Sequence, residues 1–124
     1  MNWTPATARL TEAMARVARG PRREGVYAVW LVVRAAEDRS REPPIPPKLL
    51  TRQLESLTRR LATLTPPAAI RRGVASALAL LAEGGPDAPA AALHQLTAPA
   101  RDALGPEVAD ALHAAARAAR APKQ

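Results

Sequence analysis

A stripe of leucines in the middle of the chain constrains the fold more than any other feature. Its five members are spaced four, three, four and three residues apart, which places them on one face of a helix: Leu50, Leu54, Leu57, Leu61 and Leu64. Thr65-Pro66-Pro67 follows the stripe. A Thr cap with Pro at the first helical position is typical of a helix start. We therefore expect a second helix to begin directly after the first.

The second helix of this pair repeats the apolar pattern. Its inward face comprises Ile70, Val74, Ala77, Leu78 and Leu81, and Gly84-Gly85-Pro86 ends the pattern. Two amphipathic helices with a short turn between them fold back on each other and bury both stripes. The sequence thus predicts a central antiparallel helical hairpin over residues 48–82.

Further helices are expected before the hairpin. Thr4-Pro5 opens the first, which ends at Gly20-Pro21. The apolar run Val26–Val33 suits a strand by its β-branched and aromatic content, and a helix by its i, i+3, i+4, i+7 spacing. We favour a helix, because the chain offers no second strand to pair with. Trp30 is expected to fill the space between this helix and the leucine hairpin.

Proline marks the remaining connections. The segment Glu42–Lys48 contains four prolines and predicts a polyproline II spacer, with a ligand for an aromatic-lined groove as the alternative. After the hairpin, Asp87 is expected to cap a short helix that bends or breaks at Pro99. Gly105-Pro106 then opens the last helix.

These patterns predict an all-α fold, a compact bundle of five or six short helices forming a single domain over 1–124. Leu, Ile and Val number 24 against 30 Ala, and there is no Phe, so the core has few large side chains. We expect residues 5–82 to hold the main core and 87–121 to be more loosely held. A partner chain or a second copy is expected to complete the burial.

The charge balance favours an anionic partner. The chain has 18 basic and 11 acidic residues, a net charge of +7. The candidate anion or nucleic-acid site is Arg59, Arg60, Arg71 and Arg72, which face each other across the predicted turn; heptad positions place Arg60 and Arg71 beside the seam. The alternatives are four solvated surface arginines and a compositional bias toward Arg and Ala without a binding role.

Catalysis, metal binding and a cofactor are not expected. The chain has no Cys, and its two histidines, His94 and His113, lack the spacing of metal ligands. No serine has a histidine nearby in the sequence. The longest apolar run is far shorter than the roughly 18 residues of a membrane span, and no secretion signal is visible. We expect a cytoplasmic protein that does not enter the membrane.

One stretch resembles part of a known family. The residues from Pro67 to Leu81 place a Pro, an Ile and a Gly ahead of an Ala/Leu-rich turn, at spacing similar to that in a helix of the small helical subunits of type III CRISPR effector complexes. The resemblance implies a basic helical bundle packed along a guide–target duplex. It does not assign the chain to that family.

The function expected from the sequence is that of a non-catalytic helical accessory or adaptor subunit. It would act through protein–protein contacts in a larger assembly or homo-oligomer. The alternative is a basic helical protein that contacts nucleic-acid phosphates through the arginine cluster without strong sequence specificity, such as a small subunit of a ribonucleoprotein complex.

Overall fold

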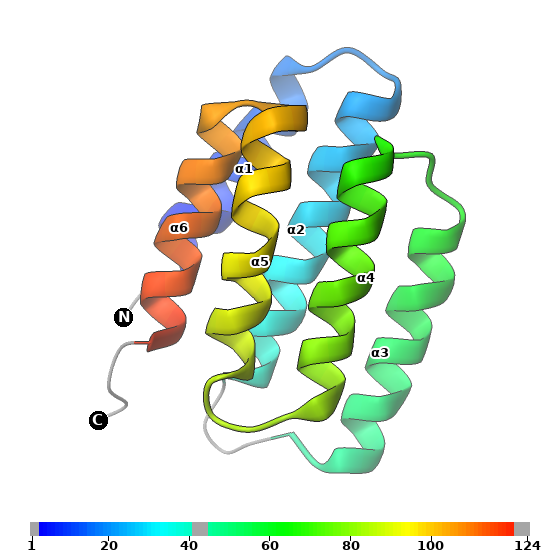
Figure 1. Ribbon diagram of the computed structural model, residues 1–124, viewed down its shortest axis with the longest axis vertical. Helices are drawn as coiled ribbons and strands as arrows, with labels where there is room; N and C mark the ends of the chain where they lie inside the picture. Colours follow the sequence, from blue (N-terminus) through cyan, green and yellow to red (C-terminus); the bar gives the residue numbers. More distant parts are fainter. Residues whose placement is uncertain (1–2, 41–44, 121–124) are drawn as a thin grey trace.

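The computed structural model describes residues 3–40 and 45–120, which form six α-helices and no strand. The helices are α1 (Thr4–Arg16), α2 (Pro21–Arg39), α3 (Pro47–Ala62), α4 (Ala68–Glu83), α5 (Ala88–Leu104) and α6 (Pro106–Arg120). They pack compactly against one another (Figure 1). The prediction of an all-α bundle of five or six helices is confirmed.

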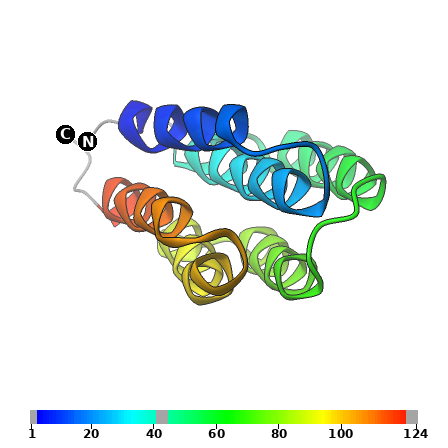
Figure 2. The ribbon, with the colours of Figure 1, turned by 90° about the horizontal axis from the view of Figure 1, so that it is seen from above.

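The helices lie in two layers of three. Figure 2 shows α1, α2 and α3 in one layer, over α6, α5 and α4 in the other. Neighbours within each layer touch, and so do the facing pairs α1 and α6, α2 and α5, and α3 and α4. Each layer has one middle helix, α2 or α5, and two outer helices.

Helix α2 is the centre of the fold, because it contacts all five other helices. The apolar run within it is helical, as the absence of a pairing strand predicted. Four valines of this run have no exposed surface: Val26, Val29, Val32 and Val33. A helix that is apolar on several sides has to be surrounded, and α2 is.

The layer of α4, α5 and α6 contains many of the buried side chains. Leu93, Leu96 and Leu112, from α5 and α6, are completely buried. Five alanines of α6 are buried beside them: Ala109, Ala111, Ala115, Ala116 and Ala118. The core therefore extends well beyond residues 5–82. Whether that segment holds most of the stability stays a prediction, and the burial of α5 and α6 leads us to expect the reverse.

The sequence predicted a bend or a break at Pro99. The break is wrong, because α5 is helical on both sides of it, and the bend stays a prediction. Helix α4 lies close to this point of α5. A Cβ added at Gly73 would lie 2.9 Å from Leu96 Cδ2 and 3.3 Å from Pro99 Cγ. Proline inside a helix removes one backbone hydrogen bond and costs about 3 kcal/mol or more. Burial of Leu96, Ala100 and Leu104 on the same helix offsets this cost.

The expectation that both stripes of the hairpin are buried is wrong for α3. All five leucines of its stripe are only half-buried, and no residue of α3 is fully buried. In contrast, Ile70, Val74 and Leu81 of α4 belong to the core. Helix α3 contacts only α2 and α4. The hairpin therefore forms the edge of the bundle, because α4 turns its apolar face toward α2 and α5.

The turn between α3 and α4 is held by a contact that the sequence did not predict. Thr65 makes no capping hydrogen bond to α4, whose first residue is Ala68. Its hydroxyl donates to Glu24 Oε2 at 2.6 Å, and its backbone N–H lies 3.3 Å from Glu24 Oε1. Thr65 thus ties the turn to the first turn of α2.

The sequence predicted that Trp30 fills the space between α2 and the leucine hairpin, and this stays a prediction. Trp30 is half-buried and packs against the core. It stacks on Tyr27, with ring centroids 5.9 Å apart. The α2 residues that line the hollow beside α3 are Leu31, Arg34, Ala35 and Asp38.

The proline-rich segment is described only in part. Residues 41–44 lie outside the described ranges, Pro46 has the polyproline II angles φ −56° and ψ 142°, and Pro47 begins α3. A proline at the first helical position loses no hydrogen bond, so the helix starts earlier than expected. Within the described ranges, no helix is long and apolar enough to cross a membrane.

Candidate interaction surface around α3

Helix α3 combines strong amphipathicity with incomplete burial. It separates its polar and apolar residues more sharply than the other five described helices. Yet Leu54, Leu61 and Leu64 are only partly buried where they pack against the core, and Leu49 is 47 % exposed. An amphipathic helix in a globular protein normally buries its apolar face. Helix α3 is the exception in this bundle.

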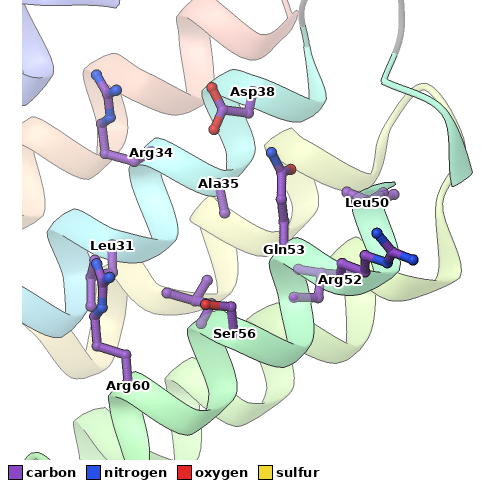
Figure 3. A pocket seen from close by; sticks show the side chains of 11 residues that line it. Leu31, Arg34, Ala35, Asp38, Leu50, Arg52, Gln53, Ser56 and Arg60 are labelled. Atoms are coloured by element: carbon purple, nitrogen blue, oxygen red, sulfur yellow. The ribbon is translucent and has the colours of Figure 1, made fainter. Parts of the chain in front are cut away.

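A groove of about 330 Å³ lies between α2 and α3. Figure 3 shows Leu31 and Ala35 of α2 opposite Gln53 and Ser56 of α3. Leu50, Leu54 and Leu57 supply further apolar lining, and the charged groups are Arg34, Asp38, Arg52 and Arg60. We call this hollow the α2/α3 groove. Basic groups outnumber acidic ones along it by three to one.

A second groove lies on the other side of α3, against α4. It consists of two hollows of about 700 and 380 Å³, which share Thr58, Ala75 and Leu78 and therefore run into each other. Leu50 and Leu54 line this groove as well as the α2/α3 groove. We call it the α3/α4 groove. The leucine stripe thus points between α2 and α4 and closes neither side completely.

The structure divides the four candidate arginines. Arg59 and Arg71 line the α3/α4 groove, whereas Arg60 lines the α2/α3 groove. Arg72 is exposed on α4 and lines neither groove. The expected placement of Arg60 beside the seam with α4 is wrong. Residues on opposite sides of the leucine stripe face different neighbours, so adjacent arginines point into different grooves. Whether any of them binds an anion stays a prediction.

Ion pairs hold some of the charged side chains, but Arg59 is not among them. Glu12 and Arg16 form a pair, with 3.5 Å between Oε2 and Nη2. Arg34 pairs with Glu37 at 3.3 Å. Glu55 and Arg59 are also four residues apart on one helix, but they form no ion pair. In the described part of the chain, Arg59 therefore has no carboxylate partner.

An aromatic stack adjoins the α2/α3 groove. Tyr27 and Trp30 stack with their planes 16° apart, and the Arg34 guanidinium lies 5.8 Å from the Trp30 ring centroid. Because Arg34 also lines the groove, the stack and the groove form one surface. Aromatic and arginine side chains are enriched where proteins bind other proteins. Sequence reasoning missed this surface by placing Trp30 in the core, although the spacing of Tyr27, Trp30 and Arg34 already indicated a common face.

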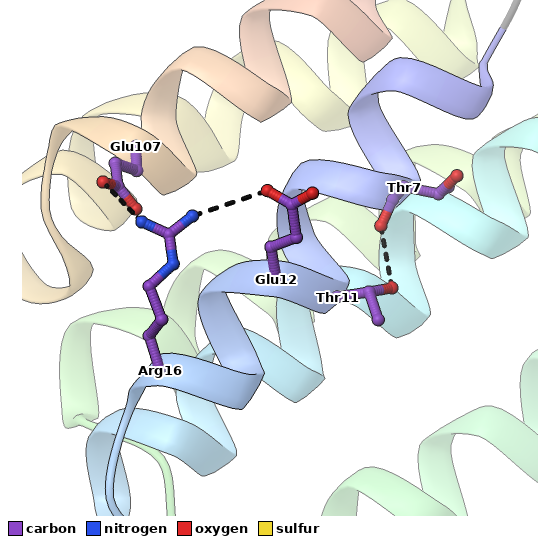
Figure 4. Close-up of polar contacts among 5 residues, drawn as sticks. All are labelled: Thr7, Thr11, Glu12, Arg16 and Glu107. Atoms are coloured by element: carbon purple, nitrogen blue, oxygen red, sulfur yellow. Dashed lines mark hydrogen bonds and ion pairs between the residues drawn. The ribbon is translucent and has the colours of Figure 1, made fainter.

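The opposite side of the bundle has a hollow that polar contacts bridge. It lies where the α1–α2 and α5–α6 turns meet, with a volume of about 620 Å³. Arg16 lies between Glu12 and Glu107, 3.2 Å from Glu107 Oε1, and joins α1 to α6 (Figure 4). Arg22 Nη2 donates a hydrogen bond of 3.1 Å to the Leu104 carbonyl. Arg16 and Arg22 thus already have partners within the chain.

The described residues contain no group of three or more His, Cys, Asp or Glu that could hold a metal ion. His94 and His113 are exposed on α5 and α6. No charged or polar side chain in residues 3–40 and 45–120 is fully buried. The surface around α3 is therefore the candidate functional site.

Comparison with known proteins adds no family to this description. The chain matches no protein-family model, no curated protein and no solved structure.

Proposed function

We propose that the protein is a non-catalytic helical adaptor that binds another protein through α3 and the two grooves beside it. One observation carries the proposal: the leucine stripe of α3 is only partly buried along its whole length, and α3 alone of the six described helices has no fully buried residue. Exposed apolar patches flanked by polar residues mark interaction sites in soluble proteins. A bound partner would remove these leucines from water.

Binding of nucleic acid is the alternative expected from the sequence. Phosphates would meet the arginines but would leave the leucines of α3 uncovered. The four candidate arginines also face different directions, since Arg59 and Arg71 line one groove, Arg60 lines the other and Arg72 lines neither. A protein partner uses both the apolar and the charged parts of this surface, so we prefer it.

Photo-crosslinking in the cells that make the protein tests the proposal. Benzoylphenylalanine would replace Gln53 in the α2/α3 groove or Ala79 in the α3/α4 groove. The matched controls are the exposed positions His94 on α5 and His113 on α6, which line neither groove. We expect nuclease-resistant protein adducts from at least one groove position and none from the controls. Adducts from the controls alone, or adducts that nuclease removes, would overturn the proposal.

The captured protein then has to bind the purified chain through α3. Leu54 lines both grooves, whereas Leu49 lies on the same helix and lines neither. Loss of a central apolar contact typically costs about 2 kcal/mol or more of binding free energy. We expect Leu54→Gln to raise the Kd at least about thirtyfold and Leu49→Gln to change it little. Equal effects would show that α3 does not bind through its grooves.

A further inference from the structure

The α3/α4 groove is long, open and apolar at its base. Its base is formed by large side chains from both helices, Leu50, Leu54, Leu61, Leu64 and Leu78. Leu50 and Ala62 are separated by about 18 Å along α3, at about 1.5 Å of rise per residue. A straight apolar groove between two helices suits a third helix, which lays one face into it. About three turns of helix would cover its length.

Three of the six α4 residues that line this groove are alanines. Ala75, Ala79 and Ala82 all line it, at i, i+4 and i+7 on α4. Ala75 and Ala79 are exposed, so neither is covered by the bundle itself. Small residues in a row let a second helix backbone approach closely, while leucines on the facing wall supply apolar area. The two walls together fit a helix with large apolar side chains.

The charged residues of the groove indicate which kind of helix would bind in it. The charged residues that line the groove are Arg59, Arg71 and Glu55, so its balance is positive. Neither arginine forms an ion pair within residues 3–40 and 45–120. Arg71 lies in the first turn of α4 and Arg59 in the last turn of α3, so both are near the α3–α4 turn. Carboxylates on an incoming helix would meet them at that end.

The geometry points to an acidic amphipathic helix of a partner protein as the occupant of the α3/α4 groove, with its carboxylates beside Arg59 and Arg71. A second copy fits less well, because each chain carries a net charge of +7 and would bring its own arginines to the contact. A nucleic acid would leave the leucines uncovered. The inference rests on the proposed adaptor function and names the class of partner.

Synthetic peptides and paired arginine variants test this assignment. The probe is an amphipathic helix of about 16 residues with leucine at every third or fourth position and glutamate beside the leucines. The comparators are the same peptide with lysine for glutamate and a scrambled peptide of equal composition. We expect only the glutamate peptide to bind, with its Kd measured by fluorescence anisotropy. Absence of binding, or equal binding of a comparator, overturns the inference.

The chain supplies a matched control for charge. The R59Q/R71Q variant changes the two arginines of the α3/α4 groove, and R60Q/R72Q changes their sequence neighbours outside it. Net charge falls equally in both variants. We expect R59Q/R71Q to raise the Kd of the glutamate peptide about tenfold. We expect R60Q/R72Q to raise it less than about threefold, because interactions between exposed charges are short-ranged at physiological salt. Equal losses of peptide affinity in the two variants would mean that the peptide is attracted to the basic protein as a whole, and would overturn the inference.

A second pair of variants tests the apolar wall. Ala79 and Ser76 are both exposed on α4, but only Ala79 lines the groove. We expect Ala79→Gln to weaken peptide binding at least about tenfold and Ser76→Gln to leave it unchanged. Circular dichroism would confirm that both variants keep their helix content. If Ala79→Gln binds the peptide as well as the unchanged protein does, the helix does not lie in this groove.

Photo-crosslinking separates failure of this inference from failure of the adaptor function. A crosslinker at Ala79 should capture a partner segment whose sequence, read by mass spectrometry, is acidic and apolar at helical spacing. Capture only from Gln53, in the α2/α3 groove, would overturn the assignment to the α3/α4 groove and leave the adaptor function standing. Capture of a basic or non-helical segment at Ala79 would overturn the acidic-helix assignment alone.

Discussion

Helices α5 and α6 carry few large apolar side chains, whereas α3 carries five leucines. Nevertheless, α5 and α6 are more completely buried than α3. In α6 only Val108 and Leu112 are large and aliphatic, yet both are buried together with five alanines. In α3 no residue is fully buried. Small side chains let two helices approach closely along their whole length. Leucines are buried only where a neighbouring helix provides a hollow to receive them.

Under the proposed adaptor function, this difference would separate the stabilising part of the domain from the part that binds a partner. On the side away from α3, α5 and α6 pack against each other along their length, and the ion pair of Arg16 with Glu107 joins α1 to α6. The side formed by α3 has a groove on each flank and contacts two helices only. Regions with few buried contacts open at lower free energy than the core. A surface that binds a partner can thus adapt without unfolding the rest.

Among these changes, truncation after Leu81 is expected to have the largest effect on stability. It removes α5 and α6, including the fully buried Leu93, Leu96 and Leu112, and exposes the inward faces of α2 and α4. We expect the fragment to lose cooperative unfolding, as measured by circular dichroism during urea titration. A cooperatively folded fragment would show instead that residues 5–82 hold most of the stability.

Matched leucine substitutions compare the two sides directly. Leu93 on α5 has no exposed surface, whereas Leu57 on α3 is half-buried. Leu→Ala in a closely packed core typically costs about 2–5 kcal/mol. We expect Leu93→Ala to lower the free energy of unfolding by about 3 kcal/mol and Leu57→Ala by about 1 kcal/mol or less, since its site is already open. Chemical denaturation measures both, and equal losses would contradict the difference in packing.

The smallest effect concerns the contact that holds the α3–α4 turn. Thr65→Val keeps the shape of the side chain but removes the hydroxyl that donates to Glu24. We expect a loss of about 1 kcal/mol, below the roughly 1.5–3 kcal/mol of better shielded hydrogen bonds to charged groups. The control is Thr63→Val in the same turn, whose hydroxyl bonds only to the nearby Arg60 carbonyl. If both variants lose the same free energy, the contact with Glu24 does not stabilise the turn.

The sequence by itself determined where the helices are. Prolines early in α1 and at the start of α6, glycines after α4 and α5, and apolar spacing within each segment are local signals, and they predicted all six helices with the exception of the unbroken α5. Local signals suffice because capping and helix propensity depend on residues a few positions apart. The run around Val29 was assigned correctly on a different ground, because its composition also suits a strand and the chain offers no second strand to pair with it.

Only the tertiary structure decided which faces are covered and which charged groups meet. The leucine stripe of α3 showed an apolar face, but its spacing does not say whether a neighbour is near enough to bury it. Likewise, Arg59 and Arg60 are adjacent in the sequence, yet they enter different grooves because α3 lies between α2 and α4. Thr65 and Glu24 are 41 residues apart and meet only when the bundle closes. Periodicity defines the faces of a helix, and packing among all six helices selects the neighbour of each face.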